Sequence, residues 1–165
     1  SYKKMKDVEM ILRFFTLAEH YLSVDGKLVE ENIKLPHGLN GAMDDYMERN
    51  RNLGPVGLDQ LSTLFTQTIS AVEAIWGAEA FKTPDRNQAR TPMYDAEMIA
   101  VAAIISAGAD VEHLKKCGKG ISEVTEQKYS TDPALNDSII KGTNTPSKIT
   151  YRIKAIYEVL ERCCE

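Results

Sequence analysis

A chain of 165 residues is long enough to form one compact domain whose core needs no disulfide or metal to hold it together. Apolar residues make up 43% and charged residues 27%, a composition that excludes an intrinsically disordered chain. The formal net charge of −4 excludes a generally basic surface that coats DNA, although it leaves room for a local basic patch.

The first predicted helix covers about residues 6–22 and carries apolar side chains on two faces. The face expected to pack on the core consists of Val8, Ile11, Leu12, Phe15 and Leu22. A nearly opposite face consists of Met10, Phe14, Leu17 and Tyr21, with Arg13 at its edge. A surface helix normally needs one apolar stripe, so this helix is built to be covered on two sides. Either the domain's own helices cover both faces, or the second face contacts another domain or a second copy of the chain.

Two further helices are predicted before the middle of the chain. A polar loop ends near Gly38, and Asn40 is the predicted N-cap of a short helix that reaches about residue 51. A connector with two glycines and a proline separates it from a helix over about residues 58–76. Gly77 is expected to end that helix at its C-terminus.

The second half of the chain contains the most apolar segment. Thr91 is predicted to cap a helix with its hydroxyl, and a proline follows at the first helical position. Residues 98–105 of this helix are apolar all round, which places them at the centre of the domain. Asp110, Asp132 and Thr145 mark the starts of three more helices. The sequence therefore predicts an all-α fold, a single compact domain over residues 1–165 with about seven helices around a central buried one.

The three histidines do not form a metal-binding motif. His20, His37 and His113 are far apart in sequence and outside any His-Glu-x-x-His pattern. Asp110 and His113 are three positions apart and could face a metal together, but a site needs three or four converging ligands. The other interpretation is that Asp110 caps a helix and His113 lies on its surface. We expect no metal site.

The three cysteines indicate reduced thiols, because their number is odd and Cys163 and Cys164 are adjacent. This favours a cytoplasmic protein. Cys117 lies among lysines, which favour a thiolate, but the sequence implies no histidine base for it, so a structural thiol is the expectation. We predict no catalytic residue and no cofactor, and therefore no enzyme activity of this chain alone. No apolar run approaches the roughly 18 residues of a membrane span.

One loop is basic enough to suggest phosphate contact. Lys82, Arg86 and Arg90 lie within residues 82–90, together with two amide side chains and a single acid, Asp85. Arginine and amide groups just before a helix N-terminus suit contact with a phosphate backbone. The alternative is a solvated loop without a ligand.

Three sequence blocks resemble domain-of-unknown-function family 262, in the order and approximate spacing of that family. The first consists of residues 4–9 (KMKDVE) followed by 12–15 (LRFF), with Lys4 where the family usually has arginine. The second is residues 39–47 (LNGAMDDYM) and the third residues 74–81 (AIWGAEAF). Together the blocks span roughly the first half of the chain.

The resemblance implies a connection with GmrSD-type restriction systems, which attack modified phage DNA. Members of the family have an N-terminal ParB/sulfiredoxin-like domain with an Asp-Gly-Gln-Gln-Arg-like motif for nucleotide chemistry, and the family has a nuclease signature of His-Asn-His type. Neither motif occurs in these residues. The resemblance therefore implies the helical C-terminal portion of such a protein, without its catalytic residues.

Three functions follow as alternatives. The first is a non-catalytic helical accessory domain of an NTP-dependent, modification-dependent restriction or phage-defence protein. Its partners would be the missing N-terminal domain, DNA, and a second copy of the chain, but no membrane. The second is a freestanding helical module for protein–protein interaction without a nucleic-acid role. The third, a small helical enzyme, lacks a set of converging catalytic residues.

Overall fold

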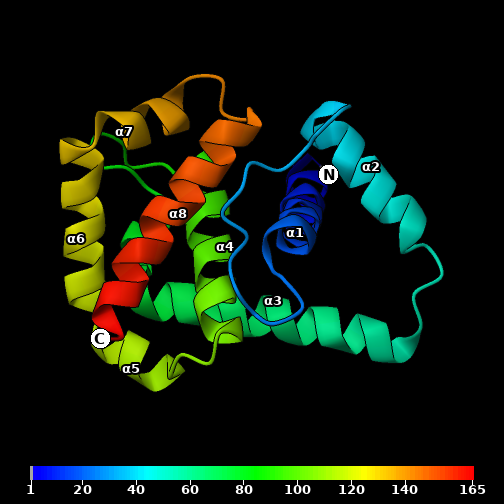
Figure 1. The fold of residues 1–165 in the computed structure, drawn as a ribbon, viewed down its shortest axis with the longest axis horizontal. Helices are drawn as coiled ribbons and strands as arrows, with labels where there is room; N and C mark the ends of the chain where they lie inside the picture. Colours follow the sequence, from blue (N-terminus) through cyan, green and yellow to red (C-terminus); the bar gives the residue numbers. More distant parts are fainter. Residues whose placement is uncertain (1) are drawn as a thin grey trace.

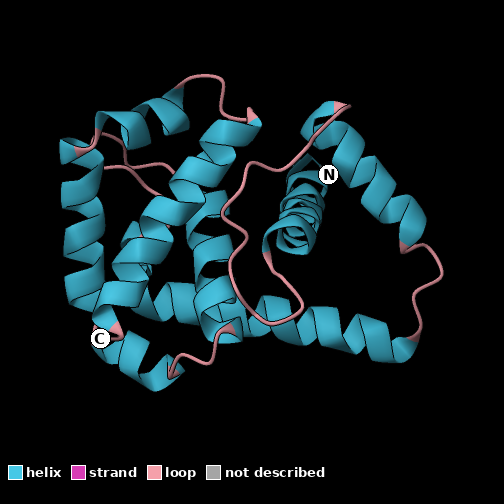
Figure 2. Cartoon of the chain, in the orientation of Figure 1, coloured by secondary structure: helices cyan, strands magenta, loops and turns pink. Residues whose placement is uncertain are grey.

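The computed structural model describes residues 2–165, and every regular element in that range is helical (Figures 1 and 2). The elements are α1 (Tyr2–Tyr21), α2 (Gly38–Arg49), α3 (Pro55–Trp76), the short 3₁₀ helix η1 (Gly77–Glu79), α4 (Thr91–Ser106), α5 (Val111–Lys116), α6 (Gly118–Thr131), α7 (Pro133–Ile140) and α8 (Pro146–Cys163). The predicted all-α class is confirmed. Within residues 2–165, no helix combines the length and apolar character needed to cross a bilayer.

The helix predicted from Asp110 onward is two helices, α5 and α6, which meet at Cys117. The glycine-rich segment that follows Cys117 has low helix propensity. Gly118 also lies against the backbone of α3, where a Cβ atom would be 3.0 Å from the Ile75 carbonyl oxygen. The break therefore lets α6 leave α5 at an angle and cross close over α3.

The helix ends agree with the sequence in part. Asp110 and Asp132 cap α5 and α7, accepting backbone N–H bonds at 3.0 Å and at 3.1 and 3.2 Å. Gly77 ends α3 with φ of +54°. The N-cap prediction for Asn40 is wrong. Helix α2 begins at Gly38, so the N-cap position is that of His37, about one helical turn before Asn40. The hydroxyl cap predicted for Thr91 is also absent, since Thr91 already lies within the first turn of α4.

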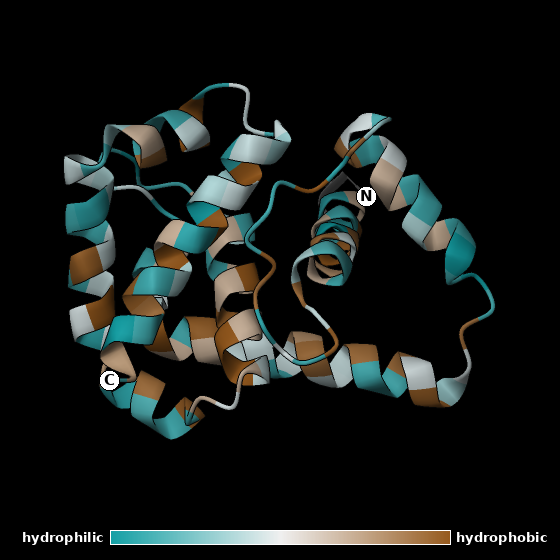
Figure 3. Cartoon of the chain, viewed as in Figure 1, coloured by the Kyte–Doolittle hydropathy of each residue, from teal (hydrophilic) through white to brown (hydrophobic). Residues whose placement is uncertain are grey.

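Helix α4 is the centre of the molecule, as its apolar sequence predicts. Residues 98–103 are fully buried and Ile104 is almost so. The helix packs most extensively on α8 and also on α1 and α3. Figure 3 shows hydrophobic colours over much of α4, whereas α2 and α6 alternate between hydrophobic and hydrophilic residues.

The second apolar face of α1 is the more deeply buried one, whereas the predicted core face is buried only in part. Phe14, Leu17 and Tyr21 are 1%, 0% and 0% exposed within the monomer, whereas Val8 of the predicted core face is 65% exposed. The Tyr94 hydroxyl of α4 donates to the Met10 carbonyl oxygen at 2.9 Å. The predicted interdomain contact through Met10, Arg13, Phe14, Leu17 and Tyr21 is contradicted for all of these residues except the half-buried Met10. Within the monomer Phe14 packs on Phe65 of α3, and Tyr21 is hydrogen-bonded to Thr150 of α8. Periodicity reveals two apolar stripes but not which one the central helix will cover.

Helix α2 and the first half of α3 extend away from the α4–α8 packing (Figure 1). Helix α2 packs chiefly on α1, through buried Leu39, Met43 and Tyr46. Phe15 of α1 stacks on Tyr46 with ring centroids 6.4 Å apart. With one helix as its main support, this side of the domain leaves apolar surface uncovered.

Candidate functional site

An open apolar groove with a volume of about 650 Å³ lies between α1 and α2. We call it the α1–α2 groove. It is lined by Lys4, Met5, Lys6, Val8, Glu9, Leu12, Asn40, Met43, Asp44 and Met47. The exposed fractions of Met5, Val8 and Met47 are 73%, 65% and 50%.

The groove is present because the Phe14 face of α1, and not the Val8 face, packs on the central helix. On the opposite stripe, α2 and α3 cover Phe15 but leave Val8 exposed. Three of the groove residues are methionines, whose flexible and polarizable side chains adapt to the shape of a partner. The rim carries both signs of charge, with Lys6 on α1 and Asp44 on α2. The groove is thus a surface suited to an amphipathic protein partner.

Arg13, predicted at the edge of an interdomain contact, lies in a buried ionic cluster instead. Its Nε donates to Asp95 Oδ1 at 2.7 Å and its Nη2 to Asp95 Oδ2 at 2.6 Å. Arg152 of α8 donates to the same Oδ2 at 2.9 Å and also to the carbonyl oxygens of Ser138 and Thr143. The cluster is inaccessible to a partner, so its role is to join α1, α4 and α8.

The three predicted phosphate-contact residues of the basic loop, Lys82, Arg86 and Arg90, differ in how far their side chains are free to bind a ligand. Arg90 donates from Nε to Thr83 Oγ1 at 2.9 Å and forms an ion pair of 3.3 Å with Asp85. Lys82 Nζ lies 3.4 Å from Asn87 Oδ1 within the same loop. Arg86 is exposed and makes no side-chain hydrogen bond to the described residues. Arg90 therefore organises the loop, and Lys82 and Arg86 are the cations left for a phosphate.

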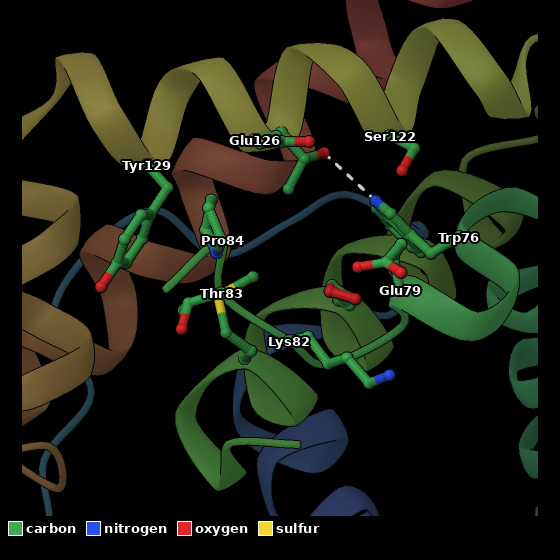
Figure 4. A pocket seen from close by; sticks show the side chains of 11 residues that line it. Trp76, Glu79, Lys82, Thr83, Pro84, Ser122, Glu126 and Tyr129 are labelled. Carbon is green, nitrogen blue, oxygen red and sulfur yellow. Dashed lines mark hydrogen bonds between the residues drawn. The ribbon is translucent and has the colours of Figure 1, made fainter. Parts of the chain in front are cut away.

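A small cleft lies where α3, α4 and α6 meet the start of this loop (Figure 4), and encloses about 120 Å³. We call it the Glu97 cleft, after the buried carboxyl of α4 that lines it. Trp76 and Tyr129 lie on opposite sides of the view, with Glu126 above and Glu79 near the Trp76 ring. Trp76 Nε1 donates to Thr125 Oγ1 at 3.2 Å, so the indole ring is held in a fixed orientation.

The Glu97 carboxyl is only 1% exposed, and the Phe81 backbone N–H donates to its Oε1 at 2.8 Å. Burial raises the pKa of Glu97 to about 8, and the hydrogen bond from Phe81 lowers it only in part. Phe81 holds φ at +66°, a left-handed value that is uncommon for a residue with a side chain. The chain thus adopts an unfavourable conformation at the residue that donates to the carboxyl.

His113, Cys117 and Cys163 meet at the C-terminal end of the chain. His113 Nε2 lies 2.8 Å from the Cys163 carbonyl oxygen and 3.6 Å from Cys117 Sγ. Asp110, its partner in the metal alternative, is occupied as the N-cap of α5. Burial raises the pKa of the Cys163 thiol. These contacts fasten the last turn of α8 to α5.

Sequence reasoning missed Asp95, Glu97 and Arg152, which are the most deeply buried charged side chains of the domain together with Arg13. A signal for the first two was present. Charged residues in a helix that is otherwise apolar on all sides have to be buried, and buried charges require partners. No comparable signal exists for Arg152, because α8 has a polar face on which an arginine is ordinary.

Comparisons of the chain with protein-family models, with curated proteins and with solved structures gave no match. No activity, ligand or partner is therefore carried over from a relative. The family resemblance described above stays a prediction based on its three sequence blocks.

Proposed function

We propose that this chain is a non-catalytic helical accessory domain of an NTP-dependent, modification-dependent restriction or phage-defence protein. In this proposal, the α1–α2 groove packs on the N-terminal, nucleotide-using domain of that protein. The observation that carries the proposal is the exposure of Met5, Val8 and Met47 around one apolar groove. Contiguous apolar surface of this kind marks an interaction site more often than scattered exposed side chains do.

The resemblance and the groove involve the same residues. Met5 and Val8 belong to the first block that resembles the family, and Met43 and Met47 belong to the second. The two blocks are about thirty positions apart in sequence, yet they form the two walls of one groove. If the blocks share a role in the family, contact with a common partner is a role that this arrangement can serve.

A DNA contact is the second element of the proposal. Lys82 and Arg86 are the cations of the basic loop whose charge is not paired with a carboxylate of the described residues. Two phosphate contacts would add weak, sequence-independent affinity to a protein that reads its DNA elsewhere. The accessory domain would thus position the nucleotide-using domain and steady it on DNA, while it turns over no NTP by itself.

The proposal is tested by titrating the chain with the N-terminal domain, produced as a separate polypeptide, in a calorimeter. We expect saturable binding that Val8→Asp abolishes, because the substitution puts a charge in the apolar groove. The matched control is Val24→Asp, since Val24 is fully exposed in the loop after α1. Equal binding by both variants would refute the groove as the contact.

A freestanding interaction module is the alternative that the same groove favours. In that case the N-terminal domain would not bind, and the groove would accept an unrelated protein or a second copy of the chain. Sedimentation of the chain alone detects binding of a second copy. In that case the chain would form a dimer, which Val8→Asp would dissociate and Val24→Asp would not.

A further inference from the structure

The Glu97 cleft contains an acid without a cationic partner. Glu97 is 1% exposed, and its hydrogen-bond donor among the described residues is the neutral N–H of Phe81. The lysine of the lining, Lys82, directs its ammonium to Asn87 Oδ1 of its own loop, at 3.4 Å. The other buried carboxyl among the described residues, Asp95, is paired with two arginines. Glu97 is the exception.

The walls of the cleft add further acceptors and two aromatic rings. Glu79 and Glu126 contribute carboxylates at its mouth, and Trp76 and Tyr129 contribute its sides (Figure 4). Aromatic faces attract cations through their quadrupole, and the attraction is strongest for tryptophan. An ammonium donates three hydrogen bonds and accepts none. A site with carboxylates and aromatic faces matches those requirements.

We propose that the Glu97 cleft binds the primary ammonium group of an alkylamine or of a lysine side chain, with the Glu97 carboxylate as its buried counter-ion. The volume of about 120 Å³ exceeds that of one water and suits a short alkyl chain with its charged end. This site is separate from the α1–α2 groove and does not depend on the function proposed for it. The free amine and the lysine side chain share one chemistry, and the experiment below distinguishes them.

Binding is coupled to the release of a proton from Glu97. In the empty cleft, burial raises the pKa of Glu97 to about 8, so the carboxyl is largely protonated at neutral pH. A bound ammonium favours the carboxylate and displaces that proton into solvent. The other titratable groups that line the cleft are Glu79 of η1, Lys82 of the loop, and Glu126 and Tyr129 of α6. Burial raises the pKa of Tyr129 above its ordinary value, away from this range.

The test is the affinity for n-butylammonium, measured by calorimetry one pH unit below and one unit above the pKa of about 8. We expect the affinity to rise about tenfold across that interval, because the Glu97 carboxyl of the ligand-free protein becomes ionised and no longer has to lose a proton on binding. Glu97→Gln keeps an acceptor for the Phe81 N–H and removes the charge, so it should lose both the rise and most of the binding. Circular dichroism confirms that the variant is folded.

Matched controls separate a specific site from general effects. Glu123→Gln removes an exposed carboxylate of α6 that does not line the cleft, and should retain the affinity and its pH dependence. The neutral isostere 1-butanol should not compete. A lysine-containing peptide that binds more tightly than n-butylammonium identifies a protein side chain as the source, and the reverse order identifies a free amine. Competition by 1-butanol, a flat pH profile, or undiminished binding by Glu97→Gln overturns the proposal.

Discussion

Arg13 of α1 and Asp95 of α4 form a buried two-point ion pair across 82 sequence positions, with bonds of 2.7 and 2.6 Å. Arg152 of α8 adds a third bond to the same carboxylate at 2.9 Å. Arg13 Nη2 also donates to Asn144 Oδ1 at 3.0 Å. A single carboxylate therefore joins the three helices that form the centre of the domain, and two guanidinium groups depend on it.

Replacing Asp95 by asparagine keeps the shape of the side chain and leaves both arginines buried without a counter-charge. We expect the free energy of unfolding to fall by about 3–5 kcal/mol, the usual cost of removing one partner of a buried ion pair. Urea denaturation measures it. The control is Glu19→Gln, which breaks the exposed pair between Glu19 and Arg49 and should cost less than about 1 kcal/mol. Similar losses in the two variants would contradict a special role of burial.

The raised pKa of Glu97 makes stability depend on pH. The folded state retains the proton up to a pKa of about 8, whereas the ordinary value is 4.5. Between these values Glu97 holds more of its proton in the folded state than in the unfolded one, so its contribution to the stability falls as pH rises, by at most about 1.4 kcal/mol per pH unit. Below 4.5 and above 8 this contribution no longer changes.

Glu97→Gln cannot ionise, so its stability relative to the wild type should increase steadily across the same interval. Thermal unfolding at several pH values measures this difference. Glu123→Gln, in which the lost carboxylate is exposed, should follow the wild type at every pH. A constant offset between Glu97→Gln and the wild type would contradict the raised pKa.

Two neighbouring glycines of α6 should respond in opposite directions to alanine. A Cβ atom at Gly118 would lie 3.0 Å from the Ile75 carbonyl oxygen and 3.1 Å from that of Ala74, against the backbone of α3. Gly118→Ala should therefore destabilise the domain, because neither helix can move without disturbing its packing. A Cβ atom at Gly120 would meet no atom of another element within 4 Å, so Gly120→Ala should raise the free energy of unfolding by up to about 1 kcal/mol. Chemical denaturation of both variants checks the sign of each change.

The basic loop makes a separate prediction for DNA binding by the complete protein. Lys82→Ala with Arg86→Ala should weaken binding to DNA of any sequence and reduce the slope of log affinity against log salt by about 2, one for each lost phosphate contact. Filter binding at several salt concentrations measures the slope. The charge-matched control replaces Lys116 and Lys119, which are exposed on α5 and α6. An unchanged slope would exclude the loop from DNA contact.

Arg90 should behave differently from its two neighbours. Its bonds to Thr83 and Asp85 hold the loop, so Arg90→Ala is expected to lower stability by about 1 kcal/mol, the ordinary contribution of such a hydrogen bond. Thermal unfolding measures the loss. A reduced salt slope without a loss of stability would instead assign Arg90 to phosphate contact.

The sequence alone determined the helical class, several helix ends and the identity of the central helix. These features are local. Asp110 and Asp132 cap the residues that directly follow them, Gly77 ends a helix through its own backbone freedom, and residues 98–103 are apolar on every side and so have no face to offer to water.

Tertiary structure decided which face of α1 enters the core, where Arg13 finds its partner, and that Glu97 has no cation. Both stripes of α1 satisfy helical periodicity equally well, and the choice between them depends on the volume that α4 and α8 leave open. The partners of Arg13 are 82 and 131 positions away, and no pattern along the chain encodes that distance. Burial and ion pairing depend on three-dimensional neighbours, so only the packed helices could show them.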